Sequence, residues 1–117
     1  MDERVNPLIL TDPVDGTVYE LDFNRESVLF AENREFKIDE MFDYPAKNVP
    51  LLFWYALRKN HKSVAKNQAE TILLDHFKGL SVKKIGTLVA LYNQARFANA
   101  VILDDDEDED EENEKNV

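Results

Sequence analysis

The 117-residue chain has no cysteine, only three glycines and no apolar run long enough to cross a membrane. Without cysteine, neither a disulfide nor a cysteine-based metal site can form. Gly16, Gly79 and Gly86 stand alone, which excludes a glycine-rich phosphate loop. The longest apolar run, residues 51–57, is far shorter than the ~20 residues of a membrane span. The N-terminal residues also lack the apolar segment of a signal peptide, so we expect a soluble, intracellular protein with no membrane partner.

The sequence is equally poor in groups that could carry out catalysis. Its two histidines are His61, in a polar turn between lysines, and His76, which directly follows Asp75. Neighbouring residues on a helix do not face each other, and neither histidine has the spacing of a metal or nucleophile motif. We expect structural or solvated roles for both. The prediction is a non-enzymatic protein without catalytic residues, metal or cofactor.

Charge divides the chain into three blocks within a formal net charge of -10. Residues 1–45 carry twelve acidic and four basic side chains, and residues 46–103 carry two acidic and nine basic ones. Residues 104–117 carry ten carboxylates and one lysine. We therefore predict one domain over residues 1–103 and a disordered acidic tail over residues 104–117. This asymmetry favours charged contacts with partners, or shielding of the basic block by the tail.

The first quarter of the sequence predicts a β-hairpin. Residues 8–10 are apolar, residues 12–16 contain the proline and glycine of a tight turn, and residues 17–23 alternate between two faces. One face should be buried, and it carries Tyr19, Leu21 and Phe23.

Helices follow the hairpin. Asn24 is a suitable N-cap for a helix over residues 25–34, and "FKID" (residues 36–39) predicts a short third strand. Pro45 and Pro50 are expected to bracket a connector. Further helices are expected over residues 51–60, residues 64–77 with Ser63 as its cap, and residues 82–100 with Ser81 as its cap. Gly79 suits a left-handed helix stop. The fold class is α+β, with an N-terminal β-hairpin packed on about four α-helices.

The stretch "PLLFWYALRKNHKSV" (residues 50–64) joins an apolar run to a basic cluster in an acidic chain. It could be a nucleic-acid surface, a membrane contact, a protein-binding face or a buried helix. A membrane-surface helix would have one apolar side, whereas this one is apolar all round. Nucleic acid is disfavoured because the chain lacks overall basicity and its aromatics are spread around the helix. Burial and partner contact both remain open.

The partner-contact interpretation makes a specific prediction. We expect Trp54 or Tyr55 to stay partly exposed and to anchor a partner helix in a groove, because aromatic side chains are typical anchors. The basic end of the stretch would meet acidic residues of the partner or of the tail. The hypothetical partner-binding residues are Leu51, Trp54, Tyr55, Arg58, Lys59 and Lys62.

Four motifs occur in a recognisable order: "LDFNRESV...AENREFKIDE", "VPLLFWYALRKNHKSV", "AETILLD" and "LVALYNQA". Residues 18–101 thereby resemble the tail assembly chaperone family of long-tailed (siphovirus-type) phages and prophages of Gram-positive bacteria. The resemblance implies a protein that binds and solubilises the tape-measure protein and aids recruitment of tail-tube subunits. It would act in the host cytoplasm and be absent from the mature virion. The alternative function is a nucleic-acid-associated regulator or an acidic nucleic-acid mimic.

Overall fold

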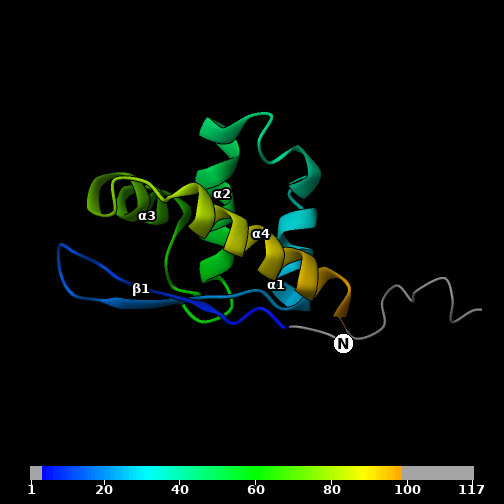
Figure 1. Ribbon diagram of the computed structural model, residues 1–117, viewed down its shortest axis with the longest axis horizontal. Coiled ribbons are helices and arrows are strands. Elements are labelled where there is room, and N and C mark those ends of the chain that lie inside the picture. The colour runs from blue at the N-terminus through cyan, green and yellow to red at the C-terminus, as the bar shows by residue number, and fades with distance from the viewer. Residues whose placement is uncertain (1–3, 99–117) are drawn as a thin grey trace, which may run out of the picture.

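The computed structural model describes residues 4–98, and the predicted acidic tail lies outside these residues. The prediction of an α+β fold with an N-terminal hairpin and four α-helices is confirmed (Figure 1). Two short helical turns of other types, η1 (3-10) and η2 (π), complete the described chain. The elements in order are β1 (Leu8–Thr11), β2 (Val18–Leu21), α1 (Arg25–Glu32), η1 (Ile38–Glu40), α2 (Pro45–Leu57), α3 (Lys66–Thr71), η2 (Ile72–His76) and α4 (Val82–Arg96).

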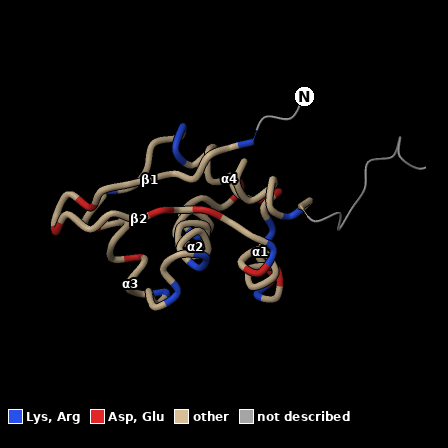
Figure 2. Tube along the Cα trace, turned by 90° about the horizontal axis from the view of Figure 1, so that it is seen from below, with Lys and Arg blue, Asp and Glu red and all other residues tan. Residues whose placement is uncertain are grey.

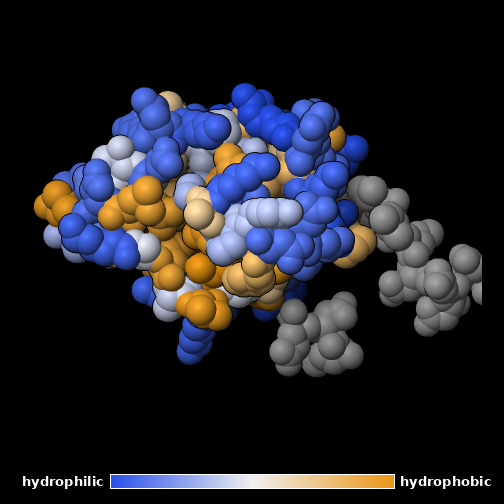
Figure 3. Space-filling view, turned by 90° about the horizontal axis from the view of Figure 1, so that it is seen from above, coloured by the Kyte–Doolittle hydropathy of each residue, from blue (hydrophilic) through white to orange (hydrophobic). Residues whose placement is uncertain are grey.

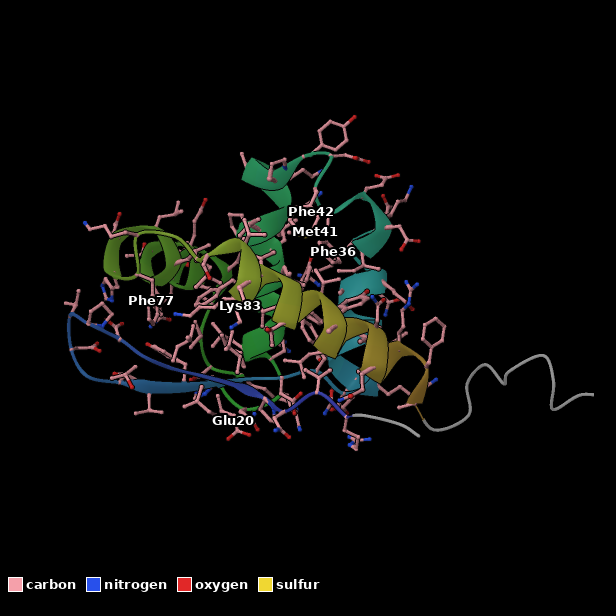
Figure 4. The ribbon with its side chains drawn as sticks, viewed as in Figure 1. Glu20, Phe36, Met41, Phe42, Phe77 and Lys83 are labelled. Atoms are coloured by element: carbon pink, nitrogen blue, oxygen red, sulfur yellow. The ribbon has the colours of Figure 1, made fainter. Side chains whose placement is uncertain are left out.

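The hairpin covers one side of the helices with one of its two faces. Its strands are antiparallel, with Leu10 opposite Tyr19. The predicted inner face of Tyr19, Leu21 and Phe23 is buried, whereas Val18 is 56% exposed. Figure 2 shows both strands in front of the helices, and Glu20 points away from them in Figure 4. The outer face of the hairpin is therefore left without a covering element among the described residues.

Asp22 is an exception to the alternation of inward and outward side chains. It lies two residues after the outward-facing Glu20, yet it is buried. Its backbone N–H donates a hydrogen bond to the Ala56 carbonyl at 3.1 Å. Its carboxylate accepts one from the Lys59 ammonium at 2.5 Å. The ion pair allows the carboxylate to be buried at the junction between hairpin and helices.

The segment after α1 is not a third strand, so that prediction was wrong. Asn24 caps α1 as expected, with a reciprocal hydrogen bond to Ser27. The chain then turns through Glu35, whose φ of 65° is left-handed, and the Phe36 N–H returns to the Ala31 carbonyl. This turn leads into η1 rather than along a strand of the sheet, and it buries Phe36 and Ile38.

α2 begins six residues earlier than predicted, so Pro45 and Pro50 do not bracket a connector. Pro45 occupies the first helical position, where its missing N–H would have no partner anyway. Pro50 lies inside the helix and leaves the Ala46 carbonyl without its usual donor. Ala46 is exposed, so water can satisfy that carbonyl. Figure 1 shows α2 running from the side away from the hairpin towards it.

The predicted helix over residues 64–77 is shorter and is divided between α3 and η2. Ser63 does not cap it; instead the Gln68 side chain accepts a hydrogen bond from the Ala65 N–H at 3.3 Å. Ala65 is exposed, because it precedes the first helical turn. Phe77 is half-buried and meets the Tyr19 ring edge-on, at 6.5 Å between centroids (Figure 4).

α4 closes the fold across the hairpin and α2. Gly79 is left-handed and Ser81 caps the helix by accepting from the Lys84 N–H, both as predicted. The last residues of the predicted helix, 99 and 100, lie outside the described part of the chain. Within residues 4–98, none of the helices combines the length and apolar character needed to span a membrane.

Candidate partner-binding surfaces

Trp54 and Tyr55 are core residues, with exposed fractions of 7% and 2%. The prediction that one of them stays partly exposed was wrong. The Phe30 ring packs edge-on against both, at centroid distances of 5.4 and 5.9 Å. The Trp54 indole N–H also donates to the Val64 carbonyl at 3.2 Å. With Phe53 buried as well, these three rings cannot form an exposed base-stacking platform in this conformation.

Two arginines shield this aromatic cluster from solvent. The Arg58 guanidinium lies over the Phe30 ring at 4.1 Å, and the Arg34 guanidinium lies over the same ring at 4.3 Å. Arg34 is also 5.5 Å from the Trp54 ring. A cation is attracted to the face of an aromatic ring, so these contacts hold α1 against α2 while covering the apolar rings.

Three of the predicted partner-binding residues come together at the C-terminal end of α2. Arg58, Lys59 and Lys62 line a hollow of about 210 Å³ beside the start of α1. Lys59 and Asn24 also line an adjoining hollow of about 380 Å³, which reaches the end of α4. We call the two together the Lys59 hollow. It is a basic surface beside the hairpin, built from α1, the C-terminal end of α2, residues 4–7 and the end of α4.

Leu51 lies on a different surface, at the N-terminal half of α2. It is half-buried and, with Lys47, lines two adjoining hollows of about 290 and 210 Å³. We call these the Leu51 groove. Pro50 adds apolar wall and Lys66 adds a cation on the α3 side, while Tyr44 lines the η1 side. In Figure 3, the face away from the hairpin shows apolar surface between hydrophilic side chains.

Two exposed aromatic residues lie in the loop before α2, and one of them, Tyr44, lines the Leu51 groove. Neither was predicted from the sequence. Phe42 is 58% exposed and Tyr44 is 63% exposed. They belong to the loop between η1 and α2, where Figure 4 shows Phe42 close to Met41. The signal was present in "MFDYP", an aromatic pair in a loop ended by a proline. Exposed aromatic side chains beside a groove are suited to anchoring a partner.

The two histidines have structural partners. Asp12 Oδ2 is 2.7 Å from His76 Nδ1, and Asp12 Oδ1 accepts a hydrogen bond from the Val14 N–H at 2.8 Å. Burial by itself would raise the pKa of Asp12, but the hydrogen bonds from His76 and Val14 outweigh it and hold that pKa below its ordinary value of 3.8. His61 accepts a hydrogen bond from the Glu20 N–H at 3.0 Å. Sequence reasoning found neither partner, since both lie far away along the chain.

The Asp12 cluster also includes Asp15, and the three side chains are close enough to surround a metal ion, with ligand atoms within 4.8 Å. Instead of facing an ion, these side chains contact one another or the backbone of the turn. Asp15 accepts from the Thr17 N–H at 3.0 Å, and both oxygens of Asp12 are already engaged. We therefore assign the cluster the structural role of fixing the hairpin turn to η2.

Comparison with protein families finds a match over almost the whole chain. The family described as "Domain of unknown function (DUF5055)" matches residues 2–117, which includes all of the residues described above. No curated protein and no solved structure matches the chain. Function is therefore inferred from the sequence motifs and from the two surfaces, the Leu51 groove and the Lys59 hollow.

Proposed function

The chain belongs to the DUF5055 family, and we propose that it is a non-enzymatic tail assembly chaperone that binds and solubilises a phage tape-measure protein. We further propose that it aids recruitment of tail-tube subunits, acts in the host cytoplasm and is absent from the mature virion. The observation that carries the proposal is the order of motifs over residues 18–101, from "LDFNRESV" to "LVALYNQA", which resembles that chaperone family.

The Leu51 groove is the surface that fits a helical client best. Apolar side chains of a client helix can lie on Leu51 and Pro50. On the walls, Lys47 and Lys66 can pair with acidic residues of the client, and Glu70 with a basic one. An amphipathic helix in an apolar groove is a common mode of peptide recognition. Tyr44 lines the edge of the groove and is exposed, so its ring can contact the client.

The corrected positions of Trp54 and Tyr55 change how α2 contributes to the proposed function. Their rings are buried against Phe30, so they hold α2 in place and do not meet the client directly. Of the originally predicted residues, Leu51 is assigned to client binding. The basic residues Arg58, Lys59 and Lys62 belong to the separate Lys59 hollow.

Co-expression with the tape-measure gene of the same phage or prophage tests the proposal. We expect the tape-measure protein to be recovered in the soluble fraction with this chain and mainly in the insoluble fraction without it. An equal soluble yield in both cultures would refute the proposed function. The genomic neighbourhood offers a second check, since a tail-tube gene upstream and a very long helical gene downstream are expected.

A further inference from the structure

α4 ends at the rim of the Lys59 hollow. Ala98, the last described residue, lines the larger part of the hollow together with Lys59. The Gln94 side chain accepts from the Val5 N–H at 2.7 Å and donates to the Val5 carbonyl at 3.2 Å, which fixes the N-terminal segment beside α4. Arg4 belongs to that segment and lines the same hollow. The chain after residue 98 therefore starts at a basic surface.

Cations outnumber carboxylates around this hollow. Of the two carboxylates, Asp22 is paired with Lys59 at 2.5 Å and Glu26 lies 3.8 Å from Lys62. The Lys62 and Glu26 side chains are 65% and 78% exposed, and a pair so open to water holds its partners weakly. Positive charge is therefore left for another anion. The five cations that line the hollow are Arg4, Arg25, Arg58, Lys59 and Lys62.

The next segment of the same chain supplies the complementary charge. Residues 104–114 contain ten carboxylates and no basic residue. Six residue steps separate Ala98 from Asp104, and an extended chain spans about 3.3–3.6 Å per residue, so Asp104 is within about 20 Å of Ala98. A tethered ligand acts at an effective concentration in the millimolar range, at which weak ion pairs are sufficient for binding.

We propose that residues 104–114 bind the Lys59 hollow of the same molecule. The acidic segment then neutralises the basic end of α2, and an anionic partner reaches Arg58 and Lys62 only by displacing it. This inference does not rest on the proposed chaperone function, because it concerns contacts within one chain. It also gives the charge asymmetry of the sequence a physical purpose, the shielding of its basic block.

A second pair of lysines provides a matched control. Lys83 and Lys84 are exposed and belong to the first turn of α4. Thirteen residues separate Lys83 from Arg96, which is about 20 Å of helix at a rise of 1.5 Å per residue. Figure 4 shows Lys83 at the end of α4 that is remote from the C-terminal end. The tail is long enough to reach either the hollow or the Lys83 and Lys84 pair. A preference for the hollow would therefore reflect its larger cluster of cations.

A spin label on the full-length chain tests the proposal. Since the chain has no cysteine, Glu112→Cys gives a single attachment site, and line broadening of backbone amide NMR signals reports proximity. At about 10 mM salt, where the Debye length is about 30 Å, we expect broadening at Arg25, Lys59 and Lys62. At about 1 M salt, where the Debye length is about 3 Å, the broadening should disappear.

Two double variants with equal changes in charge identify the binding surface. Arg25→Glu with Lys62→Glu should abolish the broadening around Lys59, whereas Lys83→Glu with Lys84→Glu should leave it intact. All four side chains are exposed, so both variants should fold. The proposal is overturned by any of three results: no broadening at low salt in the chain without the double variants, broadening as strong around Lys83 and Lys84 as around Lys59, or broadening around Lys59 that survives the first double variant.

Binding between molecules must also be distinguished. Isotope-labelled chain without a spin label is mixed with unlabelled chain that carries the label at position 112. The proposal requires little broadening in the mixture. Broadening at Lys59 could instead be as strong as when the isotope and the spin label are on the same molecule. That result would show that the tail binds a second copy, and it would overturn the intramolecular assignment.

Discussion

Asp12 and His76 form a 2.7 Å contact between the hairpin turn and the end of η2, although 64 residues separate them in the sequence. The Asp12 side chain is fully buried, and the His76 side chain is 25% exposed. The pair fixes the tip of a hairpin that is otherwise held by only four residues per strand. The turn and the π-helical segment should therefore lose structure together when this contact is removed.

Asp12→Asn should lower the free energy of unfolding at neutral pH. It should also make that free energy less dependent on pH in the acid range. The pKa of the folded Asp12 is below 3.8, so the unfolded chain binds a proton more readily. The stabilisation is therefore present above that ordinary value and is lost as the pH falls through the folded pKa. Urea unfolding midpoints as a function of pH measure this. Asp15→Asn, in the same turn but exposed, is the control, and equal midpoints for wild type and Asp12→Asn at neutral pH would contradict the assignment.

Phe23→Ala should be strongly destabilising. The ring is 5% exposed and meets the Tyr92 ring edge-on at a centroid distance of 5.1 Å. Removing a fully buried phenylalanine side chain costs about 3–5 kcal/mol in free energy of unfolding. Val18→Ala on the outer face of the same hairpin should change it by no more than about 0.5 kcal/mol. Denaturant unfolding of both variants checks the facing of β2, and similar losses would mean that the register is wrong.

Trp54→Ala should destabilise the fold by about 3–5 kcal/mol, because it would leave a cavity beside Phe30. Trp54→Phe keeps most of the apolar contact but loses the hydrogen bond to the Val64 carbonyl, which is worth about 1 kcal/mol. Thermal unfolding in the two variants should therefore separate packing from hydrogen bonding. A Trp54→Ala protein as stable as wild type would contradict a core role and would favour contact between this ring and a partner.

Nucleic-acid binding should not be detectable for the full-length chain, even at low salt. True phosphate binding becomes weaker as salt rises, with a slope set by the number of phosphates neutralised. Fluorescence anisotropy of a labelled DNA duplex and of a single strand, each over a salt series, measures this directly. Tight binding with a steep salt slope would instead support the nucleic-acid-associated alternative.

Local features of the fold were predictable from sequence because neighbouring residues determine them. Alternation identified the buried face at Tyr19 and Leu21, and Asn24 and Ser81 were identified as N-caps. Contacts between distant segments were not predictable in this way. Asp22 is buried at the end of α2, where its carboxylate pairs with Lys59, a residue 37 positions away along the chain.

The candidate site shows the same division between local and distant effects. The grouping of Arg58, Lys59 and Lys62 follows from their closeness in sequence, and the structure places them around one hollow. The burial of Trp54 depends on Phe30 of α1, which no periodicity of α2 could reveal. The apolar run was therefore correctly recognised as unusual, while the choice between core and partner face required the tertiary packing.

The most direct test of the central proposal measures the soluble fraction of the tape-measure protein in co-expression with variants of the Leu51 groove. Phe42→Ala with Tyr44→Ala removes two exposed aromatic rings from the loop before α2, one of which lines the groove, and Val82→Ala changes a 77% exposed residue at the start of α4. We predict that wild type and Val82→Ala keep the client soluble, whereas the aromatic double variant stays folded and loses most of that effect. Equal soluble fractions for all three chains and for cells without the chain would contradict the proposal.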